Sequence, residues 1–192
     1  PPLLNSSING TNLLCFQDNS GTINLTVAGG VSPYSYSWNN GAATPNLTGL
    51  AAGIYSVTIT DNNGCINNQS ITLTEPNAAL SANISGQNIL CYGDNTGSVS
   101  LIVNGGTQPY SYLWSNGAAT LNLTNVTAGI YSVTITDNNG CTYNQSITLT
   151  EPPELICSVT GTNLTISGQP TGAIDLDVNG GFGTYNYLWI GP

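Results

Sequence analysis

The feature that most constrains this chain is an internal repeat. Residues 33–41 return at 109–117 with the pattern Pro-Tyr-Ser-Tyr-x-Trp, and residues 53–65 return almost unchanged at 129–141. The shift is the same for the tryptophans (114 − 38) and for the cysteines (141 − 65), so the copies follow one another at a constant period. This period is too long for a solenoid repeat and is typical of a small independent domain.

A third copy of the repeat begins after Pro152 and contains Tyr185-Asn-Tyr-Leu-Trp189, about halfway through the unit. The copies meet at the dipeptides Glu75-Pro76 and Glu151-Pro152. We therefore expect β-sandwich repeats at residues 1–76 and 77–152 and a partial repeat at 153–192. Proline restricts a short junction, so the sequence predicts a rod of domains.

Within one copy the apolar residues alternate with polar ones, as over residues 23–27, 55–59 and 71–73. Alternation of this kind is typical of strands with one buried face. Between these segments lie the turn-forming pairs Gly29-Gly30, Asn40-Gly41 and Asn63-Gly64. Six or seven short strands per copy predict an all-β, immunoglobulin-like antiparallel sandwich, in which Trp38, Trp114 and Trp189 are expected to be core aromatic residues.

The chain contains no Lys, Arg or His and has a net charge of −9. It therefore lacks the positive surface that nucleic acids and anionic membranes attract, and its apolar runs are too short for membrane insertion. Without His or Lys there is no ordinary general base for a nucleophile, so we expect no enzyme activity. The chain also has no Met and opens on Pro1-Pro2, and we expect it to be part of a longer protein.

Each complete copy contains two cysteines, and their spacing is the same in both copies (65 − 15 and 141 − 91). This spacing predicts the intradomain disulfides Cys15–Cys65 and Cys91–Cys141, each closing a loop that stabilises a domain by about 4 kcal/mol. A zinc site would need four ligands, and one copy offers two cysteines and no His. Disulfides of this kind place the protein outside the cytoplasm.

Cys157 is the fifth cysteine and lies in the first expected strand of the third copy, where the second copy has Ala82. Ile166 stands at the position of Cys91. Two alternatives remain for Cys157: it pairs with a residue beyond Pro192, or it is a free thiol in the core.

Several motifs together resemble a known family. These are Cys-x-x-Asp-Asn-x-Gly from Cys15 and again from Cys91, Pro-Tyr-x-Tyr-x-Trp-x-Asn-Gly, Ala-Gly-x-Tyr-Ser-Val-Thr-Ile-Thr-Asp-Asn-Asn-Gly-Cys, and Thr-Glu-Pro. In this combination the chain closely resembles the SprB-type repeat of Bacteroidota cell-surface and gliding-motility adhesins, and its Tyr-x-Tyr-x-Trp strand is also similar to PKD-type stalk domains. The resemblance implies type IX secretion, display at the cell surface and a role in attachment or gliding, with no catalytic residues.

Four aspartates form the candidate ligand set. Asp18 and Asp94 follow the first cysteine of each copy, and Asp61 and Asp137 precede the second cysteine. Carboxylate and amide oxygens suit Ca²⁺, but Asp-Asn-x-Gly is also an ordinary turn in which the carboxylate accepts backbone N–H groups. The sequence thus predicts no cofactor, with calcium as the alternative, and Glu75 and Glu151 are read as linker carboxylates or as further calcium ligands.

Two main functions fit these observations. The first is the extracellular stalk of a large surface adhesin, whose partners are other repeats of the same chain. The second is a structural filament or surface layer, in which identical chains associate through their repeats. A third alternative is a carbohydrate-binding module, with surface polysaccharide as its partner.

Overall fold

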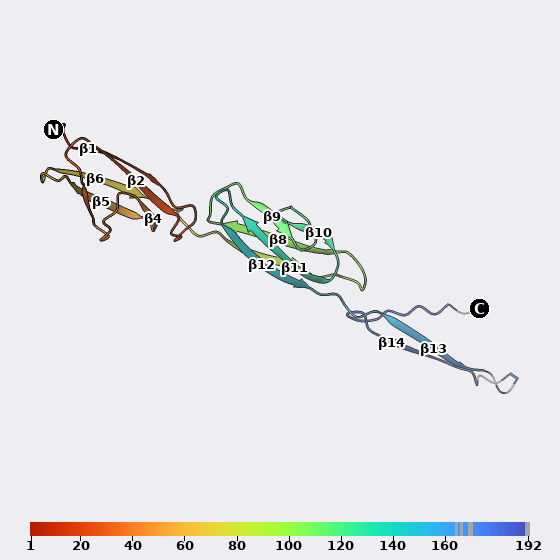
Figure 1. Cartoon of the computed structure of the whole chain (residues 1–192). Helices are drawn as coiled ribbons and strands as arrows, with labels where there is room; N and C mark the ends of the chain where they lie inside the picture. Colours follow the sequence, from red (N-terminus) through yellow and green to blue (C-terminus); the bar gives the residue numbers. More distant parts are fainter. Residues whose placement is uncertain (164, 166, 169–170, 191–192) are drawn as a thin grey trace. The chain divides into compact units, whose positions relative to one another are not determined.

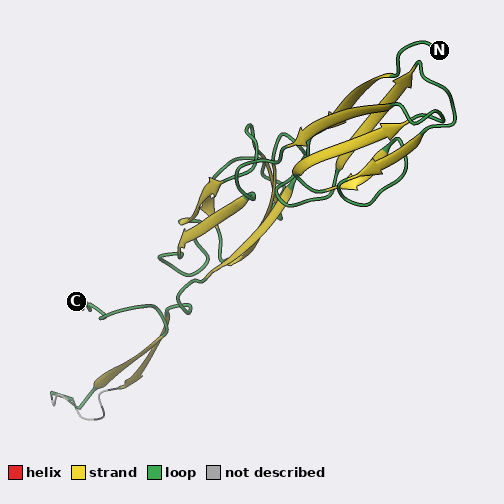
Figure 2. Ribbon diagram, turned by 90° about the vertical axis from the view of Figure 1, so that its left-hand side faces the viewer, coloured by secondary structure: helices red, strands yellow, loops and turns green. Residues whose placement is uncertain are grey.

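A computed structural model of the chain describes residues 1–163, 165, 167–168 and 171–190. Strands and loops make up the described part of the chain, which contains no helix (Figure 2). None of the described segments is therefore a helix that is long and apolar enough to cross a membrane. The prediction of an all-β chain is confirmed.

In the part of the chain that the structure describes, fourteen strands follow one another in chain order (Figure 1). The first repeat contributes β1 (Asn5–Thr11), β2 (Gly21–Ala28), β3 (Ser35–Trp38), β4 (Leu47–Leu50), β5 (Gly53–Thr60) and β6 (Ile66–Leu73). The second contributes β7 (Ser81–Gln87), β8 (Gly97–Asn104), β9 (Ser111–Trp114), β10 (Leu123–Val126), β11 (Gly129–Thr136) and β12 (Thr142–Leu149). The third stretch contributes β13 (Ile156–Thr162) and β14 (Ala173–Asn179).

The first repeat is a sandwich of two small sheets. One has the strand order β1-β2-β4 and the other has the order β3-β5-β6, and neighbouring strands in both are antiparallel. Along β2 and β5, alternate side chains turn inward, so that Ile23 and Ile59 are completely buried. Trp38 and Leu73 complete the layer between the sheets. The core is therefore built by the period-two pattern that the sequence shows.

Strand direction in this sandwich does not alternate along the chain. β4 pairs antiparallel with β2, as β1 does, so β1 and β4 run the same way. Side-chain contacts fix β6 against β1: Asn67 Nδ2 donates to the Leu4 carbonyl, and Gln69 Nε2 donates to the Ser6 carbonyl. From the first contact to the second, the residue number rises by two in both segments, from 67 to 69 and from 4 to 6. β6 therefore runs parallel to β1. The segment 39–46 carries the chain from one sheet to the other between β3 and β4, which run in the same direction.

The second repeat has the same sheets, with orders β10-β8-β7 and β12-β11-β9. Its six strands follow those of the first repeat at one constant offset, as the bounds of β1 and β7 show (81 − 5 and 87 − 11). Trp38 and Trp114 are both buried, and their indole N–H groups donate to the carbonyls of Thr44 and Thr120, each at 2.8 Å. Each tryptophan therefore packs in the core and also holds the segment between two strands.

The third stretch is a two-stranded sheet of β13 and β14. Trp189 is 60% exposed, so the prediction that it is a core residue is wrong for this chain. The reason is that the described part of the stretch supplies one hairpin, whereas Trp38 is covered by strands of two sheets. Cys157 on β13 is a free, exposed thiol, and its pairing with a residue beyond Pro192 stays a prediction.

The chain separates into two compact units. The first comprises residues 1–82, 103–112 and 134–144, and the second comprises 83–102, 113–133 and 145–192. The first unit thus contains the first repeat together with the Gly105–Thr107 and Asp137–Cys141 loops of the second. Boundaries near residues 76 and 152 stay a prediction, as does the rod.

Candidate functional site

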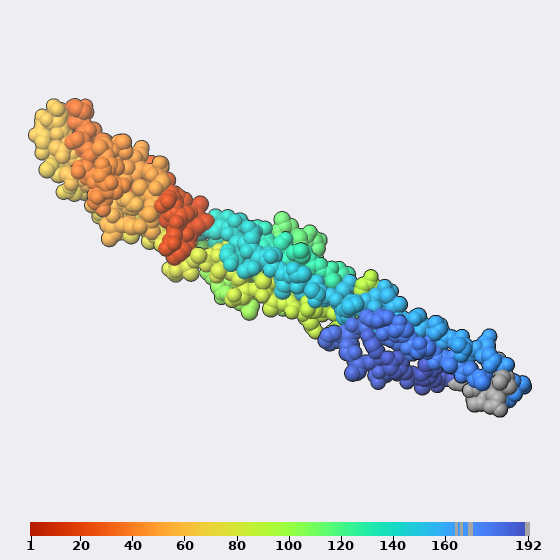
Figure 3. Space-filling model, turned by 90° about the horizontal axis from the view of Figure 1, so that it is seen from below, coloured from red at the N-terminus to blue at the C-terminus, as the bar shows by residue number. Residues whose placement is uncertain are grey.

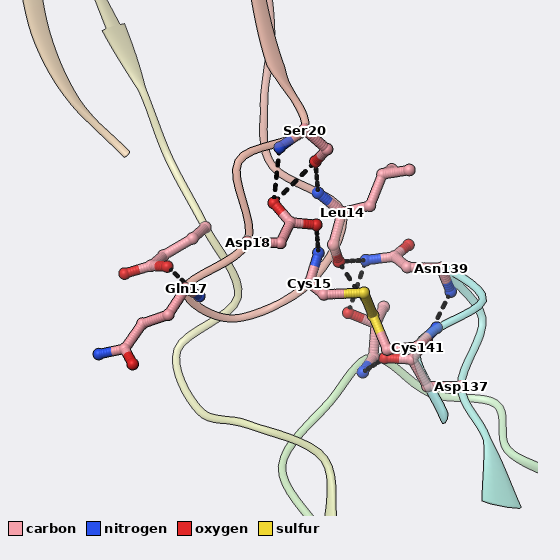
Figure 4. Close-up of a disulfide and its surroundings, with 10 residues drawn as sticks. Leu14, Cys15, Gln17, Asp18, Ser20, Asp137, Asn139 and Cys141 are labelled. Atoms are coloured by element: carbon pink, nitrogen blue, oxygen red, sulfur yellow. Dashed lines mark hydrogen bonds between the residues drawn. A yellow bond between two sulfur atoms is a disulfide. The ribbon is translucent and has the colours of Figure 1, made fainter. Parts of the chain in front are cut away.

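The first half of the candidate site is the corner that follows β1, residues 13–20. Its centre is Asp18, whose carboxylate accepts the backbone N–H of Cys15 at 2.9 Å and that of Ser20 at 3.0 Å (Figure 4). Ser20 Oγ also donates to Asp18 and accepts from the Leu14 N–H. The Asp-Asn-x-Gly motif is therefore a hydrogen-bonded turn that presents Cys15 at the surface.

These hydrogen bonds lower the pKa of Asp18 below its ordinary value of 3.8. The N–H group of Ser20 contributes most; desolvation comes second and raises the pKa, and the Ser20 hydroxyl and the Cys15 N–H then lower it further. Each of these donors stabilises the charged form of the carboxylate. Asp18 thus stays ionised at neutral pH without any cationic side chain.

Glu75 holds the same corner to the end of the repeat. Its Oε2 accepts the N–H of Gln17 at 2.5 Å, and the Leu13 N–H donates to the Thr74 carbonyl at 2.9 Å. Gln17 has a positive φ of 55°, in the left-handed region that tight corners use. The linker glutamate therefore has a defined structural contact, and the corner lies beside the last residues of β6.

The second half of the site is the loop before the last strand, which occurs as Asp61–Cys65 and as Asp137–Cys141. In the later copy, Asp137 accepts the N–H groups of Thr107, Asn139 and Cys141, each at 2.9 Å. A side-chain atom on Gly106 would lie 2.9 Å from the Asp137 carboxylate, and the φ of Gly106 is +61°. Glycine is thus required at position 106, where the loop and the carboxylate approach each other.

Asp61 repeats this arrangement in the first copy. It is buried, and its carboxylate accepts N–H groups from Val31, Asn63 and Cys65 at 2.8 to 2.9 Å. Desolvation is the largest single influence and raises the pKa of Asp61, but the donors at Cys65, Val31 and Asn63 together outweigh it. The pKa of Asp61 is therefore below 3.8 in the folded chain.

The two halves are joined by a disulfide between Cys15 and Cys141, whose Cα atoms are 5.8 Å apart (Figure 4). Asn139 Nδ2 donates to the Leu14 carbonyl at 2.8 Å beside the bond. Both halves belong to the first compact unit, and in the space-filling view the red surface near the corner adjoins the cyan surface of the later loop (Figure 3). The disulfide thus connects a cysteine of one repeat with a cysteine of the next.

This finding corrects the predicted pairing of Cys15 with Cys65 and of Cys91 with Cys141. Cys65 and Cys91 are free and exposed, like Cys157. Within one repeat the corner lies at the end of β6, while Cys65 immediately precedes its start. The eight residues of β6 separate these ends by roughly 25 Å at about 3.3 Å per residue. A disulfide requires Cα atoms within about 7 Å of each other.

The disulfide also changes the neighbours of the predicted calcium ligands. Figure 4 shows Asp18 and Asp137 on either side of the Cys15–Cys141 bond, and no group of three or more His, Cys, Asp or Glu residues suited to a metal occurs in the described part of the chain. The carboxylates of Asp18, Asp61 and Asp137 each accept N–H groups, as the turn alternative requires. Calcium binding at these residues and at Asp94 stays a prediction, and it would have to compete with those donors.

The fold and this junction define a class of protein built from repeated antiparallel sandwiches, with a covalent bond between successive copies. The family model of the SprB repeat matches the chain at residues 7–43 and 83–119, which confirms the resemblance seen in the sequence. Each match extends from the first strand past the Cys15 or Cys91 corner to the residues after β3 or β9. SprB repeats are found in cell-surface proteins, which agrees with a disulfide-bonded chain. No curated protein matches the chain.

Replacing Asp61 by Asn tests the hydrogen-bonded loop. Because its pKa is lowered in the folded state, the Asp61 carboxylate contributes stability above pH 3.8, and this contribution is lost as the pH falls through the folded pKa. We expect Asp61→Asn to lower the urea midpoint at pH 7 and to flatten the acid decline below pH 4. Asp175→Asn, on exposed β14, is the control and should leave both unchanged. An unaltered acid decline in Asp61→Asn would contradict this assignment.

The disulfide assignment is tested by counting thiols. Alkylation of the denatured, unreduced chain should label three cysteines, namely Cys65, Cys91 and Cys157, whereas pairing within each repeat leaves only Cys157. Cys141→Ala should add Cys15 to the labelled set, and mass spectrometry of the alkylated peptides measures this directly. Labelling of Cys91 instead of Cys15 in that variant would support the pairing within repeats.

Proposed function

We propose that this chain is an extracellular stalk region of a large cell-surface adhesin that serves attachment or gliding. The observation that carries this proposal is the joining of successive SprB-type sandwiches by a disulfide outside either core. Such a bond transmits force between neighbouring repeats without loading the residues that lie between its two cysteines.

The covalent path supports a mechanical role. When force is applied to the two ends of the chain, it passes along residues 1–15, crosses the disulfide to Cys141 and continues from there. The bonded cysteines are 126 residues apart in sequence, and the residues between them carry no tension. The linker after Glu75 and most of both complete sandwiches lie in this protected segment.

The chemistry of the surface supports a structural role rather than a catalytic one. The chain has no His or Lys, and the carboxylates of Asp18, Asp61 and Asp137 are engaged with backbone N–H groups. These carboxylates therefore hold loops in place and are poorly placed for acid–base work. The partners that we propose are the neighbouring repeats, with binding to other surfaces assigned to the protein's other regions.

Single-molecule pulling measures the protected segment. We expect the fully extended oxidised chain to be shorter than the reduced chain by about 45 nm, since 126 residues extend by about 3.6 Å each. Cys141→Ala should reach the longer length without reductant, while Cys157→Ala should behave as the original chain. Equal lengths in the oxidised and reduced chains would argue against the proposed force path.

Immunogold labelling of intact source cells tests the function itself. An antibody against the folded chain should label thin single fibres that project from the surface, and labelling should not require permeabilisation. Ordered bundles or a continuous coat would favour the filament or surface-layer alternative. Label confined to permeabilised cells would exclude display at the surface. Cells in which the gene is deleted provide the control for specificity.

A further inference from the structure

The two free cysteines of the complete repeats are counterparts of the two bonded ones. Cys91 follows Cys15 by one full period of the repeat, and Cys65 precedes Cys141 by the same period (91 − 15 and 141 − 65). Both free thiols are exposed. The chain therefore presents one unused corner cysteine and one unused loop cysteine, the two halves from which the Cys15–Cys141 bond is made.

The Cys91 corner shares two side-chain contacts with the bonded Cys15 corner. The Leu90 N–H donates to Thr96 Oγ1 at 3.0 Å, as the Leu14 N–H does to Ser20 Oγ at 2.9 Å. The Gly93 N–H donates to Glu151 Oε2 at 2.8 Å, matching the contact of Glu75 in the first repeat. The contacts of this corner with Thr96 and Glu151 are thus in place without a disulfide partner.

The Cys65 loop matches the bonded Cys141 loop in the same way. The Cys65 N–H donates to Asp61 Oδ1 at 2.8 Å, and the corresponding distance from Cys141 to Asp137 is 2.9 Å. In both loops the aspartate N–H donates to the cysteine carbonyl at 3.0 Å. The Cys65 loop therefore already has the hydrogen bonds of the bonded loop.

The groups that flank the bond are also present at the unused halves. Beside the bond, Asn139 donates to the Leu14 carbonyl, and the corresponding residues are Asn63 and Leu90. Phe16 lines a hollow against the start of the second repeat, and its counterpart Tyr92 is 52% exposed. A repeat that docked at the Cys91 corner would therefore find both the polar and the aromatic contact.

We propose that Cys91 is a disulfide site for the loop cysteine of the next complete repeat along a chain, and that Cys65 is the matching site for the corner cysteine of a preceding repeat. Every complete repeat then takes part in two bonds, one with each neighbour. The successive covalent loops overlap, because Cys91 lies inside the loop that Cys15 and Cys141 close. The Glu151-Pro152 linker after the Cys91 corner repeats the Glu75-Pro76 linker that the first bond spans.

The oxidant that accepts the two electrons is a small-molecule disulfide such as oxidised glutathione. The Cys91 thiolate attacks the sulfur of a loop cysteine held as a mixed disulfide with glutathione, the new S–S bond forms, and glutathione thiolate leaves. Together with formation of the mixed disulfide, two protein thiols lose two electrons and two protons. One oxidised glutathione is reduced to two molecules of glutathione.

This inference goes beyond the proposed stalk function and is independent of surface display, because the bond forms in the purified chain. If surface labelling fails, the proposal for Cys91 still stands. If the Cys91 proposal fails, the stalk function still stands, with Cys15–Cys141 as the bond between repeats.

The test lengthens the chain by inserting a second copy of residues 77–152 directly after Pro152, which adds two cysteines to the existing five. After folding in a glutathione buffer, the chain is alkylated and digested with pepsin at low pH, where thiol–disulfide exchange is suppressed. We expect mass spectrometry to find Cys91 bonded to the loop cysteine of the inserted copy. The Cys15–Cys141 peptide in the same digest serves as the internal standard for a folded junction.

Cys91→Ala in the lengthened chain is the matched control. It should leave both cysteines of the inserted copy alkylated, whereas a bond within that copy would survive the substitution. Several outcomes would overturn the proposal: a free Cys91, a bond inside the inserted copy, a bond between separate chains, or absence of the Cys15–Cys141 peptide. Cys157→Ala should change none of the bonds.

Discussion

The parallel course of β1 and β6 is the constraint on which the covalent pattern of this protein depends. Asn67 and Gln69 fix it through hydrogen bonds to the backbone of β1. Because the two strands run the same way, the corner after β1 and the loop before β6 lie at opposite ends of the sandwich. The two cysteines of one repeat therefore cannot meet, and each is available to a neighbour. The chain passes from the end of one sandwich to the start of the next at the same place, which brings Cys15 and Cys141 together.

A second constraint comes from the absence of Lys and Arg. No ion pair between side chains is possible, so carboxylates must find their partners in the backbone. Asp61 and Asp137 each accept three N–H groups, and Asp18 accepts two together with a hydroxyl. The same carboxylate contact is present in the loop of the free Cys65 and in the loop of the bonded Cys141. The acidic residues thus hold the corner and the loops in place through the backbone, as salt bridges between side chains do in other proteins.

Much of the fold was accessible from the sequence, because it depends on local patterns. The alternation around Ile23 and Ile59 identified the strands, and the constant shift between copies identified two equivalent sandwiches. The turn alternative for Asp18 matches the hydrogen bonds that the structure contains.

The predicted disulfide pairing was wrong because the pairing depends on strand direction. Equal spacing within each repeat suggested a local bond, yet the crossover at residues 39–46 lets β3 and β4 run the same way and moves Cys65 to the far end. Spacing along a chain carries no information on that crossover. The exposure of Trp189 has a similar cause, since a motif buries its tryptophan only where both sheets are present.

A disulfide within one sandwich and a disulfide between two sandwiches have different physical consequences. The first restricts the unfolded state of a single domain and leaves the linker to carry all tension between domains. The second also ties the domains to each other, and the linker then lies inside a closed loop. In this chain the protected segment contains Glu75-Pro76, both tryptophan cores and the Cys91 corner, so unfolding of either sandwich need not lengthen the chain under load. A stalk with such bonds keeps its reach even when individual domains open, which weak hydrophobic contacts at a short junction would not ensure. The bond between repeats thus protects the length of the chain, whereas the two cores protect only the separate folds.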